Sequence, residues 1–337
     1  MHRALASIAR ISDLSPIAGA DRIELARVTG WQCVVKKGEF RAGDLAVYLE
    51  IDAVPPDREA FAWLWQPKGQ TGVAQPVTFR IRTLRLRNTL SQGLLMPLAQ
   101  AGLTTGAEGD DVTELLGITK YEPPAPSGMG DWRAGFPSLA PKTDEMRVQA
   151  VPAVLDELRG QPFIATVKMD GTSSTFVMID GALHACGRNH SIAEGENLYW
   201  YVAKKHRLAE VLAGSSLAIQ GEIVGPGVQK NPVGLKDKTL FVFNLYDTRT
   251  GEHLSDTQLR EFCGKHDLQP VPLAFAGERF DETVDSLLSK AEGTYADTSN
   301  QREGIVIRPT TPMRSTALGG RLSFKAISNR YLLDERD

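Results

Sequence analysis

The sequence has few residues of the kinds that bind metals or form disulfides. It contains three cysteines and six histidines among 337 residues. Cys33, Cys186 and Cys263 lie far apart, no Cys-x-x-Cys pair occurs, and no His-Glu-x-x-His segment is present. Structural zinc sites and disulfide frameworks need clustered residues of these types. We therefore expect three ordinary buried thiols in a reducing compartment.

Long hydrophobic runs and a strong net charge are also missing. No apolar run approaches the roughly 18 residues that span a membrane. The opening segment MHRALASIARISDLSP lacks the uninterrupted apolar core of a signal peptide, so we expect a cytoplasmic protein. The net charge of −3 gives no sign of nucleic acid by itself. With 42% hydrophobic and 23% charged residues, the composition is typical of a globular protein, and the length suits two domains.

The first part of the chain predicts a small β-barrel. Gly30, Gly38 and Gly43 punctuate a series of short runs rich in Val, Ile, Leu and aromatic residues: RIELARVTG, WQCVVKKG, DLAVYLEID, FRIRTLRLR and GLLMPL. Strands of this length and spacing favour a small barrel or sandwich. The segment DDVTELLGI from Asp110 predicts a short helix, and the Pro, Gly and Ser residues of KYEPPAPSGMGDW predict a linker. We place the boundary there, near residue 125, with domains at 1–125 and 126–337.

Positive charge is concentrated in this first part. Residues 1–98 hold 13 Lys and Arg against 9 Asp and Glu, and four arginines lie within RIRTLRLR. On a strand, Arg80 and Arg82 would share one face, and a basic strand suits a phosphate backbone. Arg80, Arg82 and Arg87 are therefore candidate nucleic-acid contacts. A solvated edge strand protected by charge would show the same pattern.

The second part mixes strands and helices. Apolar runs predict strands at 163–169, 175–179, 182–186, 217–224, 240–246, 304–307 and 322–327. Helical spacing predicts helices at 143–158, 198–212, 256–266 and 282–291.

Lys168 ends one of the apolar runs, in ATVKMDGTSST. A lysine at a strand end can simply be solvated. It can instead be a nucleophile, if burial or a neighbouring cation depresses its pKa. Asp170 would project to the same side of a continuing strand and could hold the water shell of a metal. Gly171 permits close approach of the backbone.

Three further charged residues lie at or within expected core strands. Glu222 lies near the end of QGEIV, Glu303 directly precedes GIVIRP, and Lys325 lies in LSFKAIS. A surface strand end would explain Glu222 or Glu303 singly. Charged residues in such places are rarely buried unless paired, so together they favour one convergent site.

In their order, these segments resemble the motif set of the covalent nucleotidyltransferases, the superfamily of ATP-dependent ligases and RNA capping enzymes. Lys168 to Gly171 match its Lys-x-Asp-Gly motif, which alone is a weak signal. As in RNA ligases, FPSLAPKTDEMRVQ precedes this motif, and CGRN, GEIVGPGVQKNP, FVFN, EGIVIRP and FKAIS follow it. The first part, with SQGLLMPL, resembles the leading OB-like domain of the Deinococcus-type RNA ligases. The implied fold class is α+β: a small OB-like β-barrel, then an α/β nucleotidyltransferase domain of ATP-grasp-like type.

The resemblance implies an ATP-dependent ligase that seals 5′-phosphate and 3′-OH ends through lysyl-AMP and polynucleotide-AMP intermediates. Lys168 would attack the α-phosphate of ATP, and Lys325 would stabilise the charge that develops there. Phe243 would stack on adenine. The hydrated metal, Mg²⁺ or Mn²⁺, would be held by Asp170, Glu222 and Glu303. Further nucleotide contacts would come from Lys142, Thr143, Gly171 and Arg188.

Several assignments stay open at this point. Phe243 would also fit a plain core position, and Arg188 would fit a salt bridge at a turn. Val167 precedes the nucleophile where many RNA ligases carry a glutamate that reads the adenine amino group, so base selection needs another contact. Ser323 stands two positions before Lys325, where a second lysine is usual.

The implied partner is RNA, or an RNA-containing duplex with a nick, bound by a monomer. DNA ligases and capping enzymes carry a further OB domain after the last motif. Only 12 residues follow Lys325, so we expect the leading domain to hold the polynucleotide. A DNA-sealing ligase and a catalytically inactive nucleic-acid-binding protein of the same fold are the alternatives.

Overall fold

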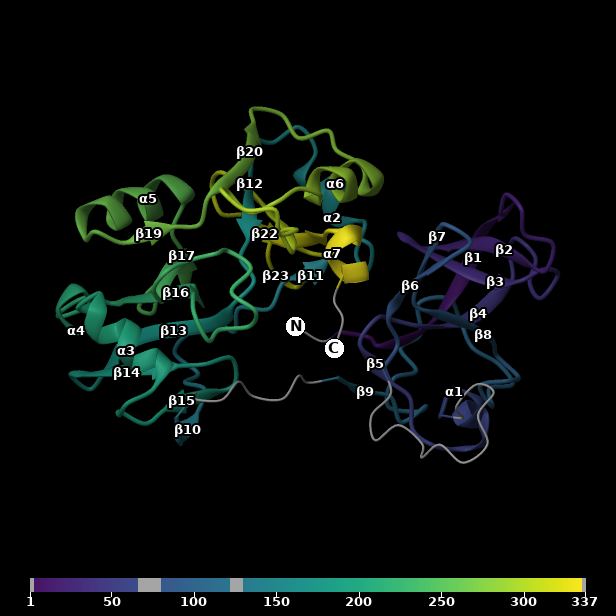
Figure 1. Ribbon diagram of the computed structural model, residues 1–337, viewed down its shortest axis with the longest axis horizontal. Coiled ribbons are helices and arrows are strands. Elements are labelled where there is room, and N and C mark those ends of the chain that lie inside the picture. The colour runs from purple at the N-terminus through teal and green to yellow at the C-terminus, as the bar shows by residue number, and fades with distance from the viewer. Residues whose placement is uncertain (1–2, 66–79, 122–129, 335–337) are drawn as a thin grey trace. The chain divides into compact units, whose positions relative to one another are not determined.

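The computed structural model of the chain describes residues 3–65, 80–121 and 130–334. They form two compact units, which divide between residues 121 and 130, and each unit is described by itself (Figure 1). The predicted boundary near residue 125 and most of the predicted linker lie outside the described residues. Within the described ranges, no helix has the length and apolar character that a membrane span requires.

The first unit is built on a five-stranded sheet, drawn in purple and blue in Figure 1. The strand order is β3-β2-β1-β4-β8, and the strands are β1 (Ala6–Pro16), β2 (Ile23–Val28), β3 (Trp31–Lys36), β4 (Leu45–Leu49) and β8 (Leu94–Pro97). The long strand β1 pairs with β4 through its first half and with β2 through its second half. A register shift between Ile11 and Asp13 separates the two halves. One irregular strand thus serves both sides of an open barrel.

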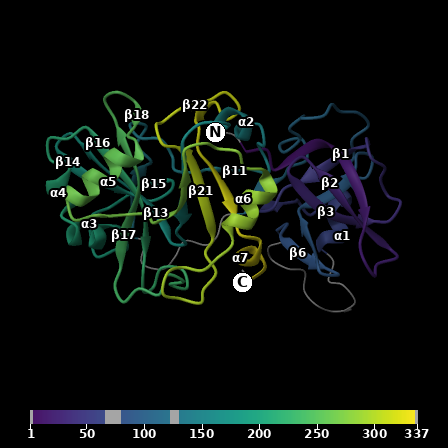
Figure 2. The ribbon, with the colours of Figure 1, turned by 90° about the horizontal axis from the view of Figure 1, so that it is seen from above.

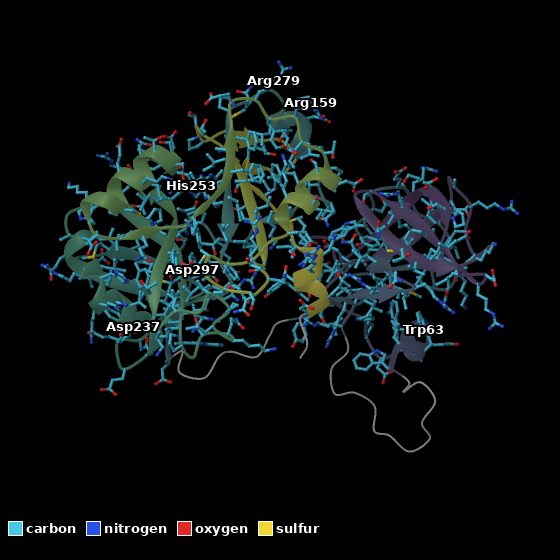
Figure 3. The ribbon with its side chains drawn as sticks, turned by 45° about the horizontal axis from the view of Figure 1, so that its top comes forward. Trp63, Arg159, Asp237, His253, Arg279 and Asp297 are labelled. Atoms are coloured by element: carbon cyan, nitrogen blue, oxygen red, sulfur yellow. The ribbon has the colours of Figure 1, made fainter. Side chains whose placement is uncertain are left out.

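Short elements complete the first unit. They are a hairpin of β6 (Thr83–Leu86) and β7 (Thr89–Gln92), the pair β5 (Ala53–Val54) and β9 (Thr119–Lys120), a 3₁₀ turn (Glu59–Phe61) and α1 (Ala62–Trp65). The core beneath them gathers apolar side chains from several of these elements, including Ile8, Leu49, Phe61 and Met96. Trp63 on α1, labelled in Figure 3, is exposed instead.

Three expectations for this unit need correction. The longest strand, β1, was absent from the predicted set. The segment from Asp110 is not a helix, because its backbone pairs with β1: Ile8 N donates to Asp110 O, and Val112 N donates to Ala6 O. Arg80 and Arg82 do not share a strand face, because β6 begins only at Thr83.

The second unit contains two sheets. The larger runs in the order β10-β15-β14-β13-β16-β17-β18, with β19 beside β17. Its strands are β10 (Trp132–Gly135), β13 (Thr172–Ile179), β14 (Ala182–Cys186), β15 (His190–Ile192), β16 (Leu217–Val224), β17 (Thr239–Asp247), β18 (Glu252–His253) and β19 (Gln269–Pro270). The smaller runs β11-β24-β21-β12-β20, and its strands are β11 (Met146–Arg147), β12 (Phe163–Lys168), β20 (Leu273–Gly277), β21 (Gly304–Pro309) and β24 (Phe324–Ile327). A two-stranded ribbon, β22 (Arg314–Ser315) and β23 (Gly320–Arg321), lies apart from both.

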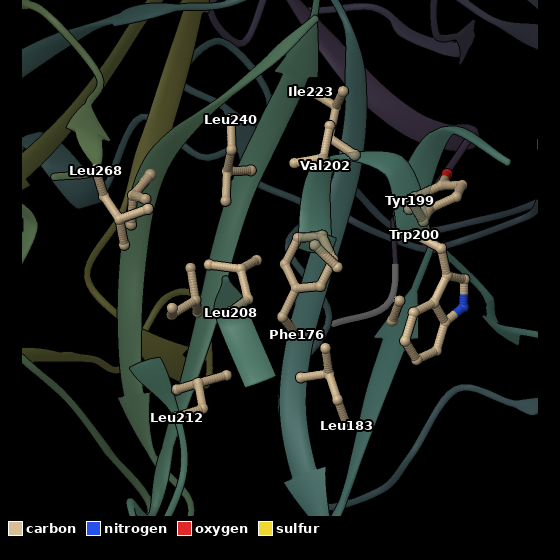
Figure 4. Packing of buried hydrophobic residues seen from close by; sticks show 14 of the residues in the cluster. Phe176, Leu183, Tyr199, Trp200, Val202, Leu208, Leu212, Ile223, Leu240 and Leu268 are labelled. Carbon is tan, nitrogen blue, oxygen red and sulfur yellow. The ribbon is translucent and has the colours of Figure 1, made fainter. Parts of the chain in front are cut away.

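Each sheet buries one face against helices. The larger sheet packs on α3 (Leu198–Lys205), α4 (Leu208–Val211) and α5 (Asp256–Lys265). Figure 4 shows Phe176, Ile223 and Leu240 of its strands among the helix side chains Tyr199 and Leu208. The smaller sheet packs on α2 (Val154–Leu158) and α6 (Val284–Ala291), and α6 lies along β21 and β24 (Figure 2). The last helix is α7 (Asn329–Asp334). The opposite faces carry polar residues beside smaller apolar clusters.

Most predicted strands of this unit are confirmed, and two helices are corrected. The predicted helix at 143–158 survives only as α2, because Met146 and Arg147 pair with β24 and Pro152 cannot donate a helical hydrogen bond. The predicted helix at 198–212 breaks into α3 and α4 at Arg207, whose φ is +51°. Helix α5 begins, as predicted, at Asp256, and its N-cap residue Ser255 forms a capping box with Gln258.

Candidate active site

Lys168 lies where the chain leaves the smaller sheet for the larger one. It is the last residue of β12, and Met169, Asp170 and Gly171 connect it to β13. Lys168 pairs with Gly304 in β21, so Glu303 lies beside it. Lys168 Nζ donates to Glu303 Oε2 at 2.5 Å. The lysine is therefore half-buried and paired, which rules out a simple solvated strand end.

Glu222 reaches the same place from the larger sheet. It lies on β16, between Ser173 of β13 and Phe241 of β17. Burial raises the pKa of Glu222 to about 8. The positive charge of Lys168 acts to lower this pKa, and the negative charges of Glu303 and Asp170 act to raise it. This carboxyl group therefore lies within electrostatic reach of the lysine and of both other carboxylates.

Asp170 and Gly171 form the turn between the sheets. Asp170 Oδ2 accepts a hydrogen bond from the hydroxyl of Tyr331 on α7 at 3.0 Å. A Cβ atom on Gly171 would lie 2.3 Å from the carbonyl oxygen of Ile223. Only glycine lets this turn lie so close to β16, as the sequence predicted.

The two lysines of the site respond to their surroundings in opposite directions. Burial lowers the pKa of Lys168, but the carboxylates of Glu303, Glu222 and Asp170 outweigh it and hold the pKa above its usual value. Burial lowers the pKa of Lys325 on β24 to about 7, and the charges of Lys168 and Arg147 act in the same direction. The carboxylates around Lys168 thus favour its protonated form.

The donor set fits a hard, hydrated cation. Asp170, Glu222 and Glu303 supply only carboxylate oxygens, which Mg²⁺ and Mn²⁺ prefer. Among the described residues, no three His, Cys, Asp or Glu side chains form a ready-made metal cage, and Mg²⁺ commonly completes its shell with water and substrate phosphates. Positive charge at these carboxylates would offset the attractions that raise the pKa of Lys168.

Phe243 occupies a bulge in β17. Gln220 pairs with Asn244 and the next residue of β16, Gly221, pairs with Val242, so Phe243 is the extra residue of β17. Leu240, Val242 and Leu245 point into the helix-covered core. Phe243 instead packs, half-buried, with Val167 and Met169 on the side of the lysine. Phe241 lies in the same cluster, as strand alternation requires, and the adenine-stacking role of Phe243 stays a prediction.

The remaining predicted nucleotide contacts pair with neighbours. Lys142 Nζ donates to Asn189 Oδ1 at 3.0 Å, and the hydroxyls of Thr143 and Ser173 lie 2.7 Å apart. Arg188 forms an ion pair with Asp144, the salt bridge that the sequence left open. Their roles in nucleotide binding stay predictions.

The predicted nucleic-acid arginines in the first unit separate into two kinds. The Arg80 side chain is 9% exposed, lies 3.3 Å from Asp52 and stacks over the ring of Tyr121 at 4.3 Å. Arg87 is exposed in the turn between β6 and β7, with a φ of +48°. Arg80 therefore faces its own unit, and the exposed surface of this hairpin is formed by residues from Leu84 to Asn88.

Two tyrosines belong to the site although the sequence did not indicate them. The hydroxyl of Tyr295 donates to Lys168 O at 3.0 Å and accepts from Glu303 N at 3.1 Å. Tyr331 holds Asp170. Neither lies in a motif or an apolar run, so only the folded chain reveals them.

Comparison with known proteins identifies this arrangement. Residues 161–327 match the RNA ligase family, and residues 5–98 match an OB-fold domain family. The chain belongs to the RNA ligase family. A Naegleria gruberi RNA ligase mutant with ATP and Mn is 36% identical to it, with a TM-score of 0.87 over 97% of this chain and 98% of that chain. A mutant with AMP and Mn (TM-score 0.87) and the ligase with PPi (TM-score 0.86) are also 36% identical and each cover 98% of both chains.

These matches confirm the two main predictions. The fold is an OB-fold half-barrel followed by a mixed α/β RNA ligase domain. The predicted function, an ATP-dependent RNA ligase, is confirmed at this level.

Proposed function

We propose that this RNA ligase seals nicks, joining 5′-phosphate to 3′-OH ends, and that Lys168 is the residue that carries AMP. The observation that supports it best is the contact between Lys168 and Glu303, within electrostatic reach of Glu222 and Asp170. A lysine at a strand-to-turn junction among three carboxylates suits a nucleophile whose charge is controlled by a bound cation.

The first chemical step requires Lys168 to lose a proton. Its Nζ then forms a bond to the α-phosphorus of ATP, while the bond from that phosphorus to the pyrophosphate oxygen breaks and pyrophosphate leaves. Lys325, on the same face of the smaller sheet, would stabilise charge on the α-phosphate oxygens. An oxygen of the RNA 5′-phosphate then bonds to the phosphorus of AMP while the bond from that phosphorus to Lys168 Nζ breaks. Finally the 3′-OH loses its proton, its oxygen bonds to the 5′-phosphorus, and AMP leaves.

A divalent cation would be held by Asp170, Glu222 and Glu303 and would neutralise charge on the substrate phosphates. The Naegleria relative was solved with ATP and with AMP in the presence of Mn. The carboxylate set of this chain suits the same kind of ion, Mg²⁺ or Mn²⁺. Tyr331 and Tyr295 would keep the carboxylates and the lysine in place.

We further propose the Deinococcus type of substrate: a nick in a duplex with RNA on the 3′-OH side, held by the OB-fold unit of a monomer. The exposed Arg85 and Arg87 on the β6–β7 hairpin suit a phosphate backbone. A cytoplasmic location stays a prediction.

Incubation of the protein with α-³²P-ATP and Mg²⁺ or Mn²⁺, followed by denaturing electrophoresis, tests the lysyl-AMP step. We expect a labelled band that loses its label when pyrophosphate is added. A second assay compares nicked duplexes with RNA or DNA on the 3′-OH side. Preferential sealing of the all-DNA nick would contradict the proposed substrate and favour a DNA-sealing ligase.

A further inference from the structure

A half-buried carboxylate, that of Glu145, lies on the nucleotide side of the smaller sheet. Glu145 Oε1 accepts hydrogen bonds from Ser323 Oγ at 2.7 Å and from Arg308 Nη2 at 3.3 Å. Ser323 and Arg308 are 2% and 5% exposed, so they fix this oxygen inside the unit. In the part of the chain that the structure describes, Glu145 Oε2 accepts no hydrogen bond, yet the side chain stays 15% exposed. One oxygen is anchored and the other is available to a ligand.

The same arginine connects this carboxylate to Phe243. Arg308 Nη1 donates to the carbonyl oxygen of Phe243 at 2.7 Å. Only one guanidinium group therefore separates Glu145 from the residue that we expect to stack on adenine. Arg308 in turn lies two positions after Val306, which pairs with Lys325. Because side chains alternate along a strand, Arg308 shares the face that carries the phosphate-binding lysine.

The backbone of the neighbouring segment also places Glu145 between the two sheets. Gln220, on the larger sheet, donates to Pro141 O at 2.7 Å. Arg147, on the smaller sheet, pairs with Lys325. The chain from 141 to 147 thus crosses from one sheet to the other, and Glu145 lies on this crossing.

Base recognition needs a hydrogen-bond acceptor at this point. Adenine carries an amino group where guanine and hypoxanthine carry a carbonyl oxygen. A carboxylate therefore attracts the amino group of adenine and repels the carbonyl oxygen of guanine or hypoxanthine. Val167, at the position where a glutamate often precedes the nucleophile, offers no polar side-chain atom. Ser323, at the position of a usual lysine, donates one hydrogen bond to Glu145 Oε1, and no cation among the described residues pairs with Oε2. The two departures from the family pattern therefore complement each other.

We propose that Glu145 Oε2 accepts a hydrogen bond from the amino group of adenine and so selects adenine nucleotides, while Arg308 and Ser323 position its carboxylate. This inference rests on the proposed nucleotide site beside Phe243. It assigns the base contact that Val167 cannot make.

The test is equilibrium binding, measured by calorimetry on the full chain without metal. AMP is compared with purine riboside 5′-monophosphate, which lacks the amino group, and with IMP, which carries a carbonyl oxygen there. For the wild-type protein we expect AMP to bind about 10- to 100-fold more tightly than purine riboside 5′-monophosphate, the range of a hydrogen bond to a charged group. In Glu145→Ala this preference should fall to about onefold.

Glu145→Gln gives a second, independent outcome. Glutamine keeps the volume, and its amide can either accept from adenine or donate to the carbonyl oxygen of hypoxanthine. IMP should therefore bind at least about tenfold more tightly to this variant than to the wild type, since the carboxylate's repulsion is replaced by a hydrogen bond. The matched control is Glu157→Gln on α2, whose carboxylate accepts from Thr316 N and Ala317 N away from the site. It should leave both preferences unchanged.

A purely structural role for Glu145 would give a different result. If Glu145→Ala weakens AMP and purine riboside 5′-monophosphate equally, or if the wild type does not distinguish them, the proposal is wrong. A failure of α-³²P-ATP labelling would instead contradict the ligase chemistry, and the binding comparison would still decide the role of Glu145.

Discussion

Tyr295 joins Lys168, the proposed nucleophile, to Glu303 through a single hydroxyl group. That hydroxyl donates to Lys168 O and accepts from Glu303 N, although Tyr295 and Lys168 are 127 residues apart in the sequence. The tyrosine is buried, so this contact fixes the backbone at the two positions from which Lys168 Nζ and Glu303 Oε2 meet. The effect of the Tyr295 hydroxyl on lysyl-AMP formation can be separated from its effect on stability.

Tyr295→Phe keeps the ring and removes the hydroxyl. Two buried backbone groups lose a partner, and we expect the free energy of unfolding to fall by about 1–3 kcal/mol. The rate of lysyl-AMP formation in a single turnover should fall about tenfold at saturating ATP, with KM for ATP little changed, since misplacement affects the reacting atoms more than the nucleotide. Tyr201→Phe removes a surface hydroxyl that donates to Asp237 (labelled in Figure 3). This control should change neither the free energy of unfolding nor the rate of lysyl-AMP formation. An unchanged adenylylation rate in Tyr295→Phe would leave the tyrosine with a packing role only.

Lys168→Ala should carry no label from α-³²P-ATP and should not join 5′-phosphate ends. Lys168→Arg should fail as well, because a guanidinium stays protonated and cannot attack phosphorus. Lys204→Ala, on the exposed side of α3, is the matched lysine control and should label normally. Label on the Lys168→Ala protein would mean that another residue is the nucleophile.

Phe243→Ala tests whether Phe243 stacks on adenine. Loss of stacking on a base corresponds to roughly 1–3 kcal/mol, so the Kd for ATP should rise about 5- to 150-fold. Phe275→Ala, on β20, removes a half-buried ring from the core between the smaller sheet and helices α2 and α6. It should lower Tm without changing ATP affinity. If Phe243→Ala lowers Tm to a similar extent and leaves Kd for ATP unchanged, Phe243 is a core residue.

Stability in mild acid should depend on His253, which Figure 3 labels on β18. Burial and the charges of Arg321 and Arg308 lower its pKa to about 3, whereas an unfolded histidine titrates near 6.5. Between these values the unfolded chain binds a proton that the folded chain excludes. The stability that His253 contributes is complete above pH 6.5. As the pH is lowered below 6.5, it decreases by up to about 1.4 kcal/mol per pH unit. In urea titrations from pH 7.5 to 4.5, His253→Gln should show a shallower decline than the wild type, and parallel curves would exclude His253 as the cause.

Arg87→Ala and Arg80→Ala should have opposite consequences in the OB-fold unit. Arg87 is exposed, so its loss should weaken binding to a nicked duplex and reduce the log–log salt slope by about 0.9, with normal stability. Arg80 pairs with Asp52 and lies over Tyr121, so its loss should lower Tm. Fluorescence anisotropy across a salt series, together with thermal melts, separates the two. Nick binding that is insensitive to Arg87→Ala would remove the hairpin turn from the proposed RNA surface.

The sequence by itself determined the local features of this ligase. The Lys168–Gly171 motif, the strand before it and the glycine that permits a close approach to β16 all depend on neighbouring residues, and all were predicted. Strands with clear apolar runs, such as β14 and β16, have the predicted bounds. Hydrophobic periodicity reports which face of a short segment is buried, and that information lies within the segment.

Only the tertiary structure decided which distant groups meet. Met146 and Arg147 lie in a segment with helical spacing, yet they form a strand because β24 offers them parallel hydrogen bonds. Arg80 turned inward because Asp52 and Tyr121 are there to receive it. The contacts of Tyr295 with Lys168 and of Glu145 with Ser323 join residues 127 and 178 positions apart. Such pairs are selected by the global packing of two sheets and leave no periodic signal in the chain, so no local pattern could have revealed them.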